Sequence, residues 1–113
     1  MSTPTGIDDR LRDEFAHLVA TLCKAVNDPK RLMLLHVLRD GPRAVSELAG
    51  AIEAPQANVS QHLAILREQG LVDTERRGVS VIYSLRHPRV LEAIDIMREV
   101  QADEAVRRAD LFT

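Results

Sequence analysis

Apolar residues near the start of the chain recur at three- and four-residue steps, which is the period of an amphipathic helix. These positions are Leu11, Phe15, Leu18, Val19, Leu22 and Val26. The pattern predicts a helix over 8–27, whereas residues 1–7 are expected to be disordered. Asp28 and Pro29 suit the N-cap and first position of a second helix, which Gly41 ends.

Two shorter helices with a tight break between them are predicted next. Ser46 is a suitable N-cap for the first of them, and Pro55 opens the second, which runs to Gln69 and stops at Gly70. The second helix has an inward face made of Val59, Leu63 and Leu66. A short helix, a proline turn and a second helix are typical of a helix-turn-helix unit.

After Gly70 the pattern changes from helical to alternating, which predicts strands over 71–75 and 79–84. Gly78 can adopt a positive φ in the turn that it forms with Arg76 and Arg77. A last amphipathic helix is predicted over 88–110. The fold class is therefore mainly α (α+β): a winged helix-turn-helix of about five helices and a two-stranded β-hairpin wing.

Length and composition indicate one domain, 1–113, in which 43–86 forms the helix-turn-helix and the wing. So short a chain buries a modest core, which such chains often complete by forming a dimer. A single cysteine excludes an intrachain disulfide. No signal peptide or membrane span is predicted, so no membrane partner and a cytoplasmic location are expected.

The charge of the chain is unevenly distributed. The net charge is −2, where a simple nucleic-acid binder would be basic. Residues 29–89 nevertheless carry nine basic and six acidic side chains, while both flanking segments are acidic. Because salt screens distant charges, the basic middle leaves a local DNA-facing patch plausible.

The predicted helix over 55–69 carries the chemistry that points to DNA. Its first half is rich in uncharged hydrogen-bonding side chains: Gln56, Asn58, Ser60, Gln61 and His62. Gln and Asn can pair with adenine edges in the major groove, and no acidic residue occurs from Ala54 to Arg67. The predicted wing adds Arg76 and Arg77, and Arg43 and Arg67 are further candidates for phosphate contacts. A solvated polar helix face is the alternative interpretation of the same residues.

A family resemblance supports the DNA-binding interpretation. The runs NVSQHLAILREQGLV, RRGVSVIYSL and AVNDPKRLMLLHVL resemble the ArsR/SmtB family of winged-helix regulators. The resemblance implies a homodimer whose first and last helices, 8–27 and 88–110, form the interface, and in which each protomer reads half of an inverted repeat in double-stranded DNA. The predicted function is that of a transcriptional repressor, with an activator as the alternative. It places DNA contacts on Gln56, Ala57, Ser60 and Gln61, with His62 following; Ala57 stands where a polar residue is frequent.

The same resemblance implies sensor sites, but this sequence is expected to lack their ligands. The family's thiolate site falls on Ala44 and Ser46, which cannot bind a soft metal ion. Its second metal site falls near His87, Arg89, Val100 and Asp103, which leave too few ligands. The two cysteines of its thiol-sensing branch fall on His36 and Ala102. Neither a metal nor another cofactor is expected.

Cys23 remains as a candidate redox or soft-metal responder, although a lone free cysteine is more often a small buried hydrophobe. Two other functions are open. A winged helix can bind a protein instead of DNA, so a protein co-regulator is one alternative. An enzyme is the other, but no catalytic set of side chains or phosphate-binding glycine loop is legible. Steep salt dependence of DNA binding would distinguish the DNA-binding interpretation.

Overall fold

The computed structural model of the protein describes residues 6–111. Most of the segment 1–7, predicted to be disordered, lies outside the described residues, and Gly6 and Ile7 precede the first helix without regular secondary structure. The helical elements are α1 (Asp9–Leu18), the π-helical turn η1 (Val19–Cys23), α2 (Lys24–Val26), α3 (Pro29–Val37), the 3₁₀ turn η2 (Leu38–Asp40), α4 (Val45–Ile52), α5 (Gln56–Glu68) and α6 (Arg89–Asp110). The strands are β1 (Arg43–Ala44), β2 (Val72–Arg77) and β3 (Ser80–Leu85).

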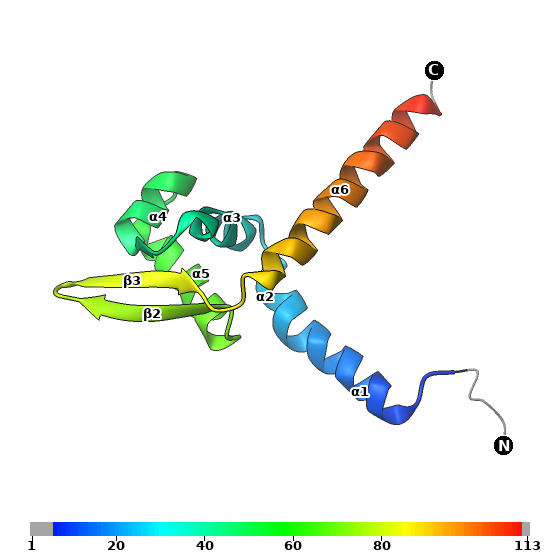
Figure 1. Ribbon diagram of the computed structural model, residues 1–113, viewed down its shortest axis with the longest axis horizontal. Coiled ribbons are helices and arrows are strands. Elements are labelled where there is room, and N and C mark those ends of the chain that lie inside the picture. Colours follow the sequence, from blue (N-terminus) through cyan, green and yellow to red (C-terminus); the bar gives the residue numbers. More distant parts are fainter. Residues whose placement is uncertain (1–5, 112–113) are drawn as a thin grey trace.

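Two helical arms project from a smaller body (Figure 1). One arm is the continuous helix formed by α1, η1 and α2, and the other is α6, which runs for 22 residues. Figure 1 shows α1 in blue and α6 in orange to red, diverging from a common root beside α2. The molecule is accordingly flat and wide, with extents of 61 × 48 × 21 Å.

The body is held together by an aliphatic core to which each of its helices contributes. The fully buried side chains include Leu34 and Leu35 of α3, Leu48 of α4, and Val59, Leu63 and Leu66 of α5. The predicted inward face of α5 is therefore confirmed. Leu91 and Ile94 seat the first turns of α6 on the same core. Between residues 6 and 111, no helix is both long and apolar enough to cross a membrane.

Helix α3 begins as its sequence predicts, but α4 does not. Asp28 is the N-cap of α3 and Pro29 its first residue. The prediction that Ser46 caps α4 is wrong, because the N-cap is Ala44 and the helix starts at Val45. The Glu47 Oε1 atom accepts a hydrogen bond from the Ala44 N–H at 3.1 Å, so the glutamate satisfies the helix start from inside the helix.

The wing is larger than the predicted two-stranded hairpin. Strand β3 lies between β1 and β2 in a three-stranded antiparallel sheet, with Arg43 opposite Tyr83. A two-residue strand is too short to show alternation, so the sequence pattern could not predict β1. Arg76 and Arg77 belong to β2, not to the turn, because they pair with β3. The turn itself uses Gly78, whose φ of +64° favours glycine.

Candidate nucleic-acid interface

Helix α5 presents a polar surface opposite its buried stripe. Pro55 precedes the helix in an extended conformation, and Gly70, with a φ of +75°, follows its end. Between them, Val59, Leu63 and Leu66 fix the inner face, because residues three and four apart share one side of a helix. The exposed positions in the first two turns are Gln56, Ala57, Ser60 and Gln61. These four residues are the ones that the family resemblance marked for DNA contact.

The start of α5 and the wing border one hollow of about 270 Å³. Gln56 and Ser60 line it from the helix, and Ser80 and Val81 line it from β3. The amide and hydroxyl groups of Gln56 and Ser60 and the tip half of β3 are therefore open on the same side of the molecule. A surface of this kind can follow a groove and the adjoining phosphates of one duplex.

The predicted arginines occupy different surroundings. Arg76 and Arg77 are exposed near the tip of the wing, where Arg77 pairs with Glu75 at 3.2 Å. Arg67 is exposed in the last turn of α5, one helix length from Gln56. Arg43 is half-buried in β1, and its Nη1 atom donates to the Pro42 carbonyl at 3.1 Å. The structure thus brings the wing arginines to an open edge and holds Arg43 closer to the body.

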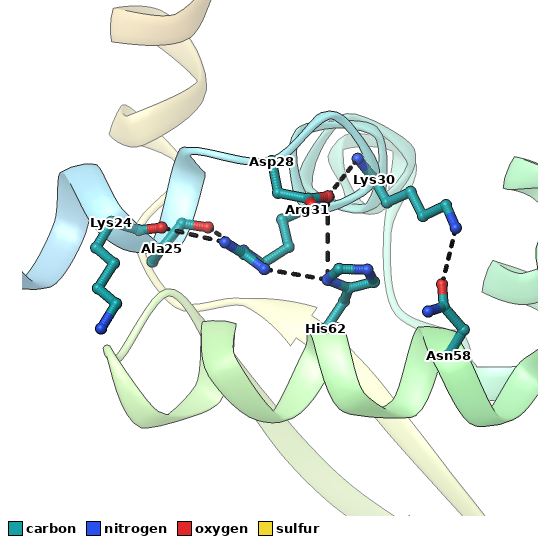
Figure 2. A network of polar contacts seen from close by, with 7 residues as sticks. All are labelled: Lys24, Ala25, Asp28, Lys30, Arg31, Asn58 and His62. Atoms are coloured by element: carbon teal, nitrogen blue, oxygen red, sulfur yellow. Dashed lines mark hydrogen bonds and ion pairs between the residues drawn. The ribbon is translucent and has the colours of Figure 1, made fainter.

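Asn58 and His62 lie on the flank of α5 that faces α3, not in the exposed row where the sequence analysis put them (Figure 2). The Asn58 Oδ1 atom accepts from Lys30 Nζ at 3.0 Å. The His62 Nδ1 atom lies 3.1 Å from Arg31 Nη1 and 4.0 Å from Asp28 Oδ1, and its side chain is only 15% exposed. Both side chains are therefore occupied with the neighbouring helix in this structure.

Asp28 is the electrostatic centre of that contact. Burial of the carboxyl tends to raise its pKa, but the backbone N–H groups of Lys30 and Arg31 donate to it and the positive charge of Arg31 stands nearby. The stabilising contributions prevail, and the pKa of Asp28 lies below its ordinary value of 3.8. The carboxylate is consequently ionised at neutral pH and holds the start of α3 next to α5.

Sequence reasoning missed Lys30 and Arg31 as residues of the site. Arg31 Nη2 donates to the Lys24 carbonyl at 3.1 Å, and its Nε donates to the Ala25 carbonyl. The Asp28-Pro29 cap signalled where α3 begins, but nothing in the sequence pairs Arg31 with a histidine 31 positions later. Figure 2 shows these contacts converging between α2, α3 and α5.

Cys23 is exposed within this chain, which differs from the interpretation of it as a buried hydrophobe. It lies in η1 and borders a hollow of about 780 Å³ together with Met97 and Arg98 of α6. Among residues 6–111, no three His, Cys, Asp or Glu side chains gather closely enough to hold a metal ion. At the positions where the resemblance implies ligands, Arg89 is a cation and Val100 a hydrocarbon, which do not fit a metal.

Comparisons with known proteins agree with this geometry. A family model described as bacterial regulatory protein, arsR family, matches residues 28–74, from the cap of α3 into the wing. The HTH-type transcriptional regulator NmtR of Mycobacterium tuberculosis is 42% identical over 85 residues, covering 75% of this chain and 71% of NmtR. The transcriptional activator HlyU of Vibrio cholerae is 37% identical over 79 residues, covering 70% of this chain and 73% of HlyU.

Solved structures of similar proteins share most of this architecture. NolR from Sinorhizobium fredii superposes with a TM-score of 0.74 at 31% identity, covering 86% of this chain and 96% of NolR. A homodimeric winged helix-turn-helix DNA-binding domain from Mycobacterium bovis gives 0.71 at 30% identity, covering 93% and 95% of the two chains. With its family model, its relatives and its fold in agreement, the chain belongs to the arsR family of bacterial regulatory proteins, which are transcriptional regulators and not enzymes.

Proposed function

We propose that the protein is a homodimeric repressor that binds an inverted-repeat operator in double-stranded DNA. Each protomer inserts the start of α5 into the major groove, and the wing meets the adjoining backbone or minor groove. The observation that carries this proposal is that the exposed polar face of α5 opens on the same side as the wing, across one shared hollow. Between Ala54 and Arg67, no acidic side chain opposes a phosphate.

In this proposal, base reading rests on the exposed row of α5. Gln56 and Gln61 can pair with adenine edges, and Ser60 can donate to a base or a phosphate. Ala57 offers a methyl group, which suits contact with a thymine methyl better than a hydrogen bond. Arg76 and Arg77 contact phosphates and so add affinity without reading the sequence. Arg67 adds a positive charge at the far end of α5. Arg43 reaches the DNA backbone from β1, at the side of the sheet.

The two arms support the homodimer. Both expose apolar side chains that a lone protomer leaves in water: Leu11, Phe15, Leu18, Val19 and Leu22 on the first arm, and Ile96, Met97 and Val100 on α6. Contiguous apolar stripes of this kind mark interaction surfaces. An isologous dimer through 8–27 and 88–110 buries both stripes and presents two copies of α5, which is the symmetry of an inverted repeat.

The proposal is tested first by selecting bound fragments from the source genome, followed by anisotropy titrations of a selected duplex and a scrambled one. We expect an inverted repeat and a steep loss of affinity with salt, because phosphate contacts release counterions. Transcription in vitro from the selected promoter should fall when the protein is added. Fragments with no shared repeat, or affinity that does not change with salt, would refute the proposal.

The dimer is tested separately at Met97, which is 57% exposed in the protomer. Met97→Glu places a charge in the proposed interface and should yield monomers in analytical ultracentrifugation, with weaker operator binding. Met97→Leu keeps an apolar side chain of similar size and serves as the matched control. Unchanged dimers in Met97→Glu would show that α6 is not part of the interface.

A further inference from the structure

One guanidinium group joins three helical elements at the root of the first arm. Arg31 extends from α3, donates through Nε and Nη2 to the carbonyls of Ala25 and Lys24 in α2, and reaches His62 of α5 through Nη1 at 3.1 Å. Figure 2 shows the guanidinium lying between the end of α2 and the imidazole. The arm and the DNA-facing helix are thus connected through one side chain.

The chemistry of this bridge requires an arginine. A guanidinium only donates, so its contact with the Nδ1 atom of His62 is a hydrogen bond in which the ring nitrogen accepts. The planar group sends donors in fixed directions to separate acceptors, whereas a lysine ammonium is a point charge on a flexible stem. A lysine could retain the charge at this position but not the three-way connection.

The root of the arm has little apolar packing, in which the partly buried Val26 joins Ala25 against the core. Neither α1 nor η1 contains a buried residue, and α2 buries only Ala25. The buried methyl group of Ala25 resists separation of α2 from the core. Hydrophobic contact is not directional, however, so it does not fix the angle between the arm and the body. On the other side of the bridge, Asp28 fixes the start of α3 and Lys30 ties α3 to Asn58 of α5. The directional bonds of Arg31 therefore complete a rigid path from arm to α5.

We propose that Arg31 is a positioning residue that sets the angle between the arm and α5, and thereby the half-site spacing that the dimer accepts. This inference rests on the proposed function. At about 1.5 Å per residue, the arm from Asp9 to Val26 is about 27 Å long, so a tilt of about 10° at its root moves its far end by about 5 Å. That displacement exceeds one base-pair step of about 3.4 Å.

The test uses full-length protein and a set of duplexes that carry the selected half-sites at centre-to-centre separations from about 8 to about 13 base pairs. Anisotropy titrations give the affinity at each spacing for the natural protein, Arg31→Lys, His62→Leu and the double variant. Arg86→Lys is the matched control, because Arg86 lies outside α5 and both arms and its side chain is 56% exposed. Thermal melts establish that each variant is folded.

For the natural protein and Arg86→Lys, we expect a displacement of one base pair from the best spacing to cost about tenfold in affinity. Arg31→Lys and His62→Leu should each reduce that affinity ratio to about twofold. The double variant should show the same ratio as either single variant, because both substitutions remove the same connection between Arg31 and His62. Affinity that falls equally at every spacing in both single variants shows a merely structural role and overturns the inference. If the natural protein itself has no spacing preference, the proposed inverted-repeat function fails, and this inference fails with it.

Discussion

Replacing Asp28 by alanine removes the cap on which the start of α3 depends. Its Oδ1 atom accepts from the backbone N–H groups of Lys30 at 2.8 Å and Arg31 at 3.3 Å. Loss of an aspartate N-cap costs about 0.5–2 kcal/mol in the free energy of unfolding. We expect Asp28→Ala to fall in the upper half of that range, because α3 contributes Leu34 and Leu35 to the core. The melting temperature of a domain this small should fall by about 4–8 °C for each kcal/mol.

Asp28→Asn separates the charge of this carboxylate from its geometry. Asparagine keeps the side-chain oxygen that caps α3 but loses the attraction to Arg31 and to the helix N-terminus, so it should cost only about 0.3–1 kcal/mol. Because the folded-state pKa of Asp28 lies below 3.8, its charge stabilises the protein fully above that value. The difference between the natural protein and Asp28→Asn should therefore shrink as the pH falls from 3.8 through the lowered pKa.

The measurement is urea unfolding followed by circular dichroism, at one protomer concentration because dimerisation makes stability depend on concentration. Asp13→Asn is the control, since Asp13 is an exposed aspartate of α1 that caps no helix. An Asp28→Asn protein as unstable as Asp28→Ala would refute the capping argument. A charge difference that does not shrink as the pH falls below 3.8 would refute the pKa argument.

Three further predictions concern the DNA-facing surface and the core. Gln61→Ala should reduce discrimination between the operator and random DNA by about 1–3 kcal/mol in competition titrations, and unchanged specificity would mean that α5 reads bases elsewhere. Replacing Arg76 and Arg77 by alanine should weaken binding to the operator and to random DNA alike. The slope of log affinity against log salt concentration should fall in magnitude by about one for each phosphate contact that is lost, and an unchanged slope would show that the wing is not part of the interface. Leu63→Ala empties a fully buried position and should cost about 2–5 kcal/mol in urea unfolding, whereas Leu63→Met should cost less than about 1.5 kcal/mol.

The sequence predicted the order of the elements because each has a strong local signal. Buried residues three and four apart defined α5, alternation defined β2 and β3, and the Asp28-Pro29 pair marked the start of α3. Strand β1 was not predicted, because its pairing with β3 is a contact between segments that are distant in the sequence. Helix α4 began earlier than predicted because Glu47 replaces the cap that Ser46 was expected to provide.

The orientation of α5 was harder to predict than its existence. Polar residues flank its buried stripe on both sides, with Ser60 on the flank that borders the hollow shared with the wing and His62 on the flank that faces α3. Hydropathy locates the stripe but does not tell which flank a neighbouring helix covers. The positions of Asp28 and Arg31 at the start of α3 show that His62 is turned inward.

The net charge of −2 does not oppose the proposed DNA binding, because the acidic excess lies in the flanking segments 1–28 and 90–113, whereas Glu75 on the wing is paired with Arg77. The segment 90–113 carries three basic and six acidic side chains, and nearly all of it lies on α6, which Figure 1 shows extending away from the wing and α5. Some of this charge is also paired: the hydrogen bond from Arg39 at 2.6 Å, with Arg98 nearby, keeps the pKa of Asp95 below its ordinary value. At physiological salt, charges are screened over about 8 Å. In a molecule 61 Å across, a duplex bound at α5 therefore experiences the local charge of α5 and the wing far more than the charge of α6.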